Sequence, residues 1–220
     1  MSDASMDDNR PFVDKEPLKP GEYKEIVTDL TSQEMPQVPL STTLADITAP
    51  IVFIDDTHRR TPVANILNYN DAQRLRDLGF THYLIEGSAA VQPLLDQLNQ
   101  HTGTVELRGE NRLSPFGANP SYINAIYNME GRGLEVRAID HPANFDPEAR
   151  GSITEEDRES FIHQQVKNVR AKGGRPVILF GGSHTQPGLI RGTAPSVTQR
   201  LLDDGENVAT VRYNLPPQKT

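Results

Sequence analysis

The chain contains no cysteine, and this absence excludes a whole group of sites. Without a thiol there is no disulfide, no thiolate zinc or iron–sulfur centre and no cysteine nucleophile. The compartment stays open, because a secreted protein can also fold without disulfides. Catalytic groups must therefore come from imidazole, carboxylate, hydroxyl or cationic side chains.

Long apolar runs and basic stripes are also missing. No run approaches the roughly 20 apolar residues that cross a bilayer, and the first residues lack the features of a secretory signal. The chain has 22 Lys and Arg against 30 Asp and Glu, a formal net charge of -8. Because no basic stripe is available to neutralise phosphates, we expect no nucleic-acid partner. A cytoplasmic location is expected, with export by a specialised system left open.

Composition divides the chain into a polar leader and an α/β domain. Residues 1–40 are polar and punctuated by proline, which predicts a flexible N-terminal tail. Within this tail, Tyr23, Ile26, Val27 and Leu30 are candidates for a short docking segment. Residues 41–220 are expected to form one domain, because their length suits a single core.

After residue 49 the pattern alternates apolar runs with amphipathic segments. The runs predict strands at 50–54, 82–85, 134–139, 176–180 and 208–213, with a further short strand at 105–107. Helices are expected between them, beginning near Thr61, Asn119 and Thr154, which are favourable N-cap residues. This alternation predicts a three-layer α/β fold: a mostly parallel sheet of about five or six strands, with helices on both faces.

Ionisable residues follow four of these strands where each apolar run turns polar. They are Asp55, Asp56 and His58, then Glu86, then Asp140 and His141, and finally His184 after Ser183. The carboxyl ends of parallel strands meet at one edge, where open α/β sheets bind their ligands. We therefore predict a site at this edge.

The first strand end has the residues of a general base. A carboxylate raises the basicity of a neighbouring imidazole and orients it, so Asp55 or Asp56 beside His58 suits that role. The alternative is a capped turn beside a solvated histidine. Arg59 and Arg60 are candidates for holding a substrate carboxylate or phosphate, or are solvated loop residues.

The other strand ends add carboxylates, an imidazole and a hydroxyl. Glu86 directly follows a buried run, which favours a functional or ion-pairing role, whereas Asp140 also suits a turn cap. The two glycines before His184 let a ligand approach the backbone. Ser183 is a weak nucleophile candidate, because Thr185 stands where the elbow motif of serine hydrolases has glycine.

Nucleotide-binding loops and the His-Glu-x-x-His zinc motif are absent from the sequence. A divalent metal held by His58, His184 and a carboxylate is still allowed by the ligand types alone. Haem is the less favoured cofactor.

Taken in order, these motifs resemble a known superfamily over about residues 49–213. The segments are Ile54-Asp55-Asp56-Thr57-His58, Leu78-Gly79-Phe80, Leu84-Ile85-Glu86, Ala138-Ile139-Asp140, Arg158 and Gly181–His184. They are similar to motifs in the group that joins erythromycin esterases, ChaN-type haem-binding proteins and Tiki/TraB-type proteins. The first segment departs from the esterase pattern, because Asp55 replaces a glutamate and the preceding glycine is missing.

The resemblance implies a hydrolase that activates water against an ester, lactone or amide in a small-molecule or peptide substrate. His58 would be the general base, oriented by Asp55 or Asp56. Glu86 and Asp140 would shape the proton network, and His184 would bind the substrate or stabilise the oxyanion. Substrate contacts would come from Arg59, Arg60, His141, Arg158 and Ser183.

Other functions remain open on the same fold. If a metal takes part, the resemblance implies His58, Glu86 and His184 as its ligands, with bound water as nucleophile. One alternative is a haem- or metal-binding protein without turnover. The other is a non-catalytic interaction or effector protein, since fold does not dictate function.

Overall fold

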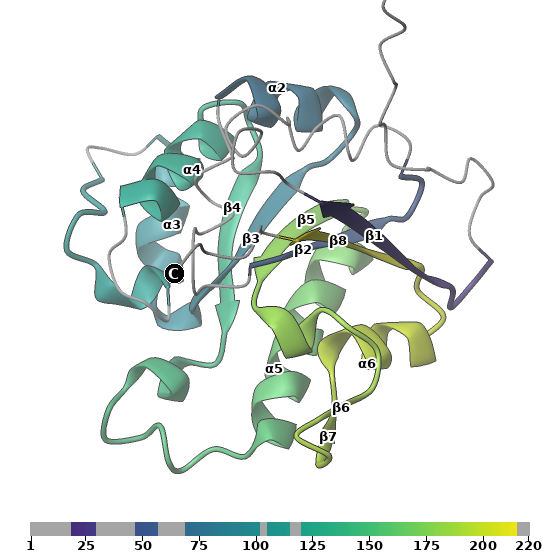
Figure 1. Ribbon diagram of the computed structural model, residues 1–220. Helices are drawn as coiled ribbons and strands as arrows, with labels where there is room; N and C mark the ends of the chain where they lie inside the picture. The colour runs from purple at the N-terminus through teal and green to yellow at the C-terminus, as the bar shows by residue number, and fades with distance from the viewer. Residues whose placement is uncertain (1–18, 30–46, 57–68, 102–104, 115–119, 215–220) are drawn as a thin grey trace, which may run out of the picture.

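Six parallel strands form the centre of the computed structural model (Figure 1). They are β1 (Tyr23–Asp29), β2 (Ile51–Asp55), β3 (His82–Ser88), β4 (Glu135–Asp140), β5 (Pro176–Phe180) and β8 (Val208–Asn214), in the order β1-β8-β2-β5-β3-β4. The structure describes residues 19–29, 47–56, 69–101, 105–114 and 120–214. Every neighbouring pair is parallel, so all six strands end at the same edge.

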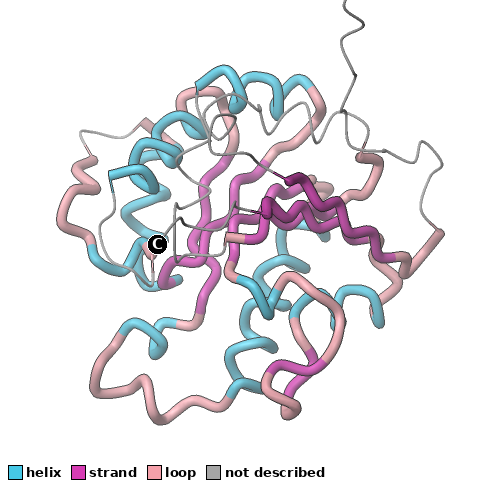
Figure 2. Tube along the Cα trace, viewed as in Figure 1, coloured by secondary structure: helices cyan, strands magenta, loops and turns pink. Residues whose placement is uncertain are grey.

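Helices cover both faces of this sheet, as Figure 2 shows. One face packs against α2 (Tyr69–Asp77), α3 (Gln92–Asn99) and α4 (Pro120–Glu130), and the other against α5 (Glu155–Ala171) and α6 (Val197–Asp203). Alternation along β2 feeds both cores: Val52 and Ile54 join the first, while Ile51 and Phe53 join the second. The predicted three-layer α/β architecture is confirmed. Among the described residues no helix is long and apolar enough to cross a membrane.

The start of α5 is fixed by the cap that the sequence predicts. The Thr154 hydroxyl accepts from the Asp157 amide at 3.1 Å, and the Asp157 carboxylate accepts from the Thr154 amide at 3.1 Å. This reciprocal capping box satisfies two amides that the helix leaves unpaired. It fixes where the helix begins, and hence where the next residues, Arg158 and Glu159, lie relative to the strand ends.

One strand lies inside the predicted N-terminal tail. Tyr23–Asp29 pairs with β8 along its whole length, from Tyr23 opposite Val208 to Asp29 opposite Asn214. Ile26, one of the candidate docking residues, is buried. The flexible-tail prediction is therefore wrong for this segment, because sheet pairing satisfies its backbone. Residues 1–18 and 30–46 lie outside the described part of the chain.

The strand predicted at 105–107 does not form. The Tyr127 hydroxyl of α4 donates to the Val105 carbonyl at 3.0 Å and accepts from the Leu107 amide at 3.4 Å. A side chain therefore takes the backbone groups that a neighbouring strand would pair. The two short strands β6 (Leu189–Ile190) and β7 (Ala194–Pro195) instead make a small antiparallel pair between β5 and α6.

Candidate functional site

Apart from Arg158 of α5, the predicted site residues that the structure describes lie at or just after neighbouring strand ends. In the sheet β2, β5, β3 and β4 are adjacent. Their carboxyl ends carry five buried ionisable residues: Asp55, Asp56, Glu86, Asp140 and His184. Buried charges are costly unless they are paired, so their partners decide what the site can do.

Arg158 of α5 binds the ends of three strands with one guanidinium group. Its Nε and Nη2 donate to the two carboxylate oxygens of Asp140 at 2.9 and 2.6 Å. Nη2 also donates to Glu86 Oε1 at 3.0 Å, and Nη1 lies 3.0 Å from His184 Nε2. The sequence-predicted residues Glu86, Asp140, Arg158 and His184 therefore belong to one network.

The charge of Arg158 is secured by its neighbours. Burial lowers the pKa of the guanidinium, but the hydrogen bonds and charge of Asp140 and the charges of Glu86 and Glu159 outweigh it, so the net pKa is raised. Arg158 therefore stays cationic. A guanidinium has five N–H donors; four are engaged here, and the fifth has no partner among the described residues.

His184 is held by a residue that the sequence interpretation missed. Its Nδ1 lies 2.5 Å from Oε1 of Glu159, which is fully buried, and Glu159 Oε2 accepts from the Val197 amide at 2.7 Å. Because the guanidinium can only donate, His184 Nε2 accepts from Arg158 and Nδ1 carries the proton. The imidazole is thus neutral and of one tautomer in this arrangement.

A signal for Glu159 was present in the helix pattern. Glu159 lies three, seven and ten positions before Ile162, Val166 and Val169, which form the buried stripe of α5. A carboxylate on an apolar stripe needs a buried partner. The sequence could therefore have flagged Glu159, although not which group it binds.

Further hydrogen bonds from the backbone and a side-chain amide fix the two carboxylates that bind Arg158. The Gly181 amide donates to Glu86 Oε2 at 2.8 Å. The His141 amide donates to Asp140 Oδ1 at 2.7 Å, and the Asn144 side chain donates to Asp140 Oδ2 at 3.0 Å. The acceptors are thus oriented before any ligand arrives, which is a requirement of preorganised sites.

The two aspartates after β2 have other partners. Asp55 accepts from Arg212 Nε at 3.1 Å, and the same guanidinium pairs with Glu25 of β1 at 3.0 Å. Asp56 accepts a hydrogen bond from the Tyr122 hydroxyl of α4. Both aspartates are thus anchored at the strand end. His58, Arg59 and Arg60, with their predicted roles, lie outside the described residues.

Two further candidates lie beside the network. His141 Nδ1 accepts from the Ala143 amide at 3.2 Å, and its ring meets Phe161 edge-on at 5.0 Å between centroids. Ser183 is exposed, and within the described residues no hydrogen bond joins its hydroxyl to His184. His184 is therefore not placed as the base of a serine nucleophile.

The described residues do not fit a metal centre. Within the part of the chain that the structure describes, no group of three or more His, Asp or Glu side chains could hold a metal ion. The Arg158 guanidinium contacts both Glu86 and His184, so a cation already occupies the position between these two predicted ligands.

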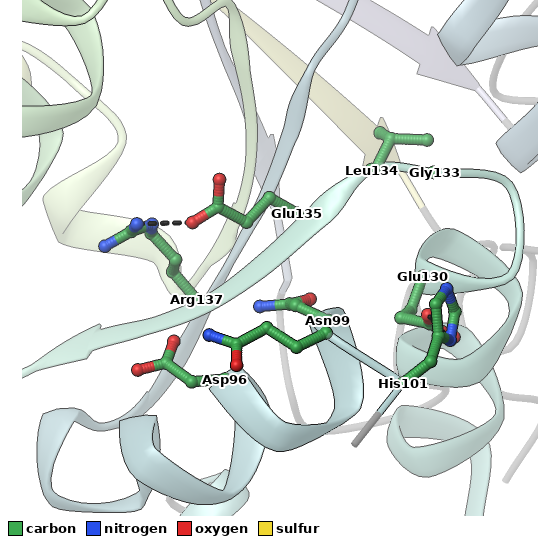
Figure 3. A pocket seen from close by; sticks show the side chains of 9 residues that line it. Asp96, Asn99, His101, Glu130, Gly133, Leu134, Glu135 and Arg137 are labelled. Carbon is green, nitrogen blue, oxygen red and sulfur yellow. Dashed lines mark hydrogen bonds and ion pairs between the residues drawn. The ribbon is translucent and has the colours of Figure 1, made fainter.

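A separate hollow of about 480 Å³ lies at the opposite end of β4 (Figure 3). Its polar side chains have partners within the chain: Arg137 pairs with Glu135, and His101 Nδ1 lies 3.2 Å from Glu130 Oε1. Asn99 exchanges two hydrogen bonds of 2.9 Å with the backbone of Val136, which closes the edge of the sheet. These contacts are those of a strand edge closed by a helix.

The sequence matches no known protein family and no curated protein. Solved structures nevertheless share the fold. A structure of bacterial protein toxins has a TM-score of 0.53 and 16% identity, covering 80% of this chain and 38% of its own. A second such structure has a TM-score of 0.51 and 17% identity, covering 80% and 37%.

A third similar structure is the C-terminal region of Pasteurella multocida toxin, described with a thiol-protease-like catalytic triad. Its TM-score is 0.52 at 15% identity, covering 81% of this chain and 25% of its own. The chain therefore spans well under half the length of these proteins. At such identities the likeness shows a shared fold, one that occurs in bacterial toxins.

Proposed function

We propose that this chain is a toxin- or effector-type domain that hydrolyses an ester, lactone or amide at the carboxyl edge of its sheet. The observation that carries the proposal is the buried network of Glu86, Asp140, Arg158, Glu159 and His184. An oriented imidazole and an oriented cation side by side are what acyl transfer requires.

In the proposed mechanism Arg158 stabilises the developing oxyanion. The substrate carbonyl oxygen accepts the fifth N–H of Arg158, whose other donors fix the plane of the guanidinium. Negative charge forms on that oxygen as water attacks, and a fixed guanidinium beside it lowers the barrier. His184 accepts from Nη1 and so keeps the cation in position. This deepens the substrate-binding role that the resemblance implies for Arg158.

The water is proposed to be activated by His58, which follows Asp55 and Asp56 at the end of β2. His58 would take a proton from water and return it to the leaving group, so no covalent intermediate is needed. The family resemblance supports this assignment. The thiol chemistry described for the Pasteurella toxin cannot transfer, because the 220 residues contain no cysteine.

The test is turnover of a panel of aryl esters, lactones and aryl amides by the full chain and by His58→Ala and His184→Gln. We expect His58→Ala to lower kcat/KM about 100-fold or more, the usual range for losing an acid–base group. His184→Gln should lower kcat/KM because Arg158 loses the acceptor that holds it in position. His101→Gln is the matched control, because that histidine is exposed and far from the strand ends. Full turnover by His58→Ala would refute the assignment of the base.

One observation favours a second function, that of a non-catalytic effector. His184 Nε2 is occupied by Arg158, and the network is internally paired as a structural ion cluster would be. In this case the whole panel gives no turnover, and any phenotype caused by expressing the chain in cells survives His58→Ala. Loss of that phenotype in His58→Ala would exclude the second function.

A further inference from the structure

A groove of about 550 Å³ opens beside the network, at the same edge of the sheet. It is lined by Ser88, Ala90, Arg112, His141, Pro142, Ala143, Phe145, Asp146, Pro147 and Ala149. Ser88 lies two residues after Glu86 on β3, and His141 directly follows Asp140 of β4. A molecule in this groove therefore lies next to two of the carboxylates that bind Arg158.

One wall of the groove depends on Gly87. A Cβ at this position would lie 2.8 Å from the Leu113 carbonyl oxygen and 3.3 Å from that of Arg112. Glycine thus allows the turn Asn111–Leu113 to pack directly against β3. This close packing brings Arg112 to the groove beside Ser88.

The opposite wall is the segment 141–149, which is fixed to the network. Asn144 donates to Asp140, the Ala143 amide donates to His141, and the Ala149 amide donates to the Asp146 carbonyl at 3.2 Å. Pro142 and Pro147 restrict the backbone further. The groove is therefore largely preformed, as most small-molecule sites are.

The lining has an apolar part, a set of N–H donors and one carboxylate, Asp146, which is exposed and accepts a hydrogen bond from the Glu148 amide. Apolar side chains come from Ala90, Pro142, Ala143, Phe145, Pro147 and Ala149, and the small alanines leave the space open. Neutral His141 uses Nδ1 as an acceptor, so its proton is on Nε2, which is a donor. Arg112 uses Nε and Nη2 to bind Glu110 at 2.7 Å each, which leaves its Nη1 donors for a ligand.

We infer that this groove binds the apolar acyl part of a carboxylic substrate, with the carbonyl oxygen on Arg158 and the second carboxyl oxygen facing His141 and Arg112. The apolar wall and small alanines suit an aromatic or branched group, and the N–H donors suit a carbonyl or carboxylate oxygen. As a description of substrate class the inference rests on the proposed hydrolase function. As a binding site it stands independently and can be tested without turnover.

The binding test uses 4-phenylbutyrate as the probe, with ligand-observed NMR and chemical-shift titration on the full chain. Ala90 is exposed and lines the groove. An indole at this position in Ala90→Trp therefore fills the groove without entering the protein core. We expect about tenfold or greater loss of affinity in that variant. Ala171→Trp, at an exposed position at the end of α5, is the matched control and should bind as the wild type does.

The polar end has its own readout. Arg112→Gln should weaken 4-phenylbutyrate about threefold to tenfold and leave the neutral 4-phenylbutanol unchanged, because only the carboxylate uses the guanidinium. No saturable binding by the wild type, or equal affinity in Ala90→Trp, overturns the inference. Equal weakening of both probes by Arg112→Gln overturns the orientation.

Turnover separates this inference from the proposed function. If both hold, Ala90→Trp lowers the ratio of kcat/KM for an aryl phenylbutyrate ester over an aryl acetate ester about tenfold or more. An unchanged ratio with normal hydrolysis overturns the groove and leaves the hydrolase intact. Binding of the probe without hydrolysis of any ester overturns the hydrolase and supports the groove as a site for carboxylates.

Discussion

Two partly buried arginines lie at opposite ends of the same sheet, and their partners differ in kind. Arg175, just before β5, donates to the carbonyl oxygens of Leu78 and Ile47 at 2.6 Å each and stacks over Phe80 at 4.2 Å. Arg158, at the carboxyl edge, binds two carboxylates and an imidazole. Arg175 therefore joins backbone segments, whereas Arg158 joins ionisable side chains.

The pKa directions express the same contrast. Burial lowers the pKa of Arg175, and the charge of Arg170 lowers it further. At Arg158 the carboxylates reverse the effect of burial and raise the pKa. Arg175 shows that a partly buried arginine in this fold can be satisfied by carbonyl partners. Carboxylates and an imidazole around a partly buried cation are more typical of a functional site.

The largest expected effects on the free energy of unfolding come from replacing each arginine in turn. Arg158→Met leaves Glu86 and Asp140 buried without their cation, so we expect a loss of about 3–5 kcal/mol in the free energy of unfolding at pH 7.5. Arg175→Met removes hydrogen bonds from carbonyl groups, which costs about 1–3 kcal/mol. Urea unfolding measures both.

The two losses in the free energy of unfolding should also differ in their pH dependence. In Arg158→Met the deficit should shrink as pH falls towards 4, because protonation removes the carboxylate charges that Arg158 no longer balances. In Arg175→Met it should not change with carboxylate protonation, because the partners are carbonyl groups. Equal losses in the free energy of unfolding, with the same pH dependence, would show that the two arginines stabilise the fold in the same way.

The strand ends at the carboxyl edge could be predicted because their signal is local. Glu86 and Asp140 each follow an apolar run directly, and parallel strands bring such positions together. Arg158 was predicted as a site residue from the resemblance to a known superfamily. These residues are joined in the network as the order of the motifs predicts.

The remaining features depend on contacts between distant parts of the chain. Glu159 binds His184 across 25 positions, and no local pattern names that partner. β1 was missed because it is an edge strand with polar residues such as Lys24 and Glu25, and its neighbour β8 is almost at the other end of the chain. Val105 and Leu107 have a strand-like sequence, yet the Tyr127 hydroxyl takes their backbone groups.

Glu159 gives the next prediction, which concerns the carboxyl edge alone. Glu159→Gln keeps the shape and can still accept from the Val197 amide, but it removes the carboxylate that fixes the His184 tautomer. We expect a lower kcat, because His184 no longer holds Arg158 in one position, and a changed pattern of ¹⁵N shifts in the His184 ring. Glu156→Gln, on the exposed side of the same helix, is the matched control.

The two readouts together define the role of Glu159 as a positioning residue. A loss of activity with unchanged His184 ring shifts would mean that Glu159 acts by another route. Unchanged activity with altered shifts would mean that the tautomer of His184 does not affect the rate-determining step.

The smallest expected effect concerns histidines away from the network. Burial lowers the pKa of His82, at the start of β3, and the raising effect of Glu135 does not offset it. Burial likewise lowers the pKa of His163 on α5, against the opposing charge of Asp204. The folded state thus prefers both imidazoles neutral, whereas in the unfolded chain they titrate near an ordinary value of about 6.5.

The sign of the pH effect follows from this difference. Below about pH 6.5 the unfolded chain binds protons that the folded chain resists, so stability falls as pH drops, and above that value the contribution is fully present. We expect His82→Gln and His163→Gln each to flatten the decline of the urea midpoint between about pH 7 and 5, a window in which the ordinary carboxylates stay ionised. An unchanged slope in the double variant His82→Gln, His163→Gln would contradict the assignment of this acid sensitivity to the two histidines.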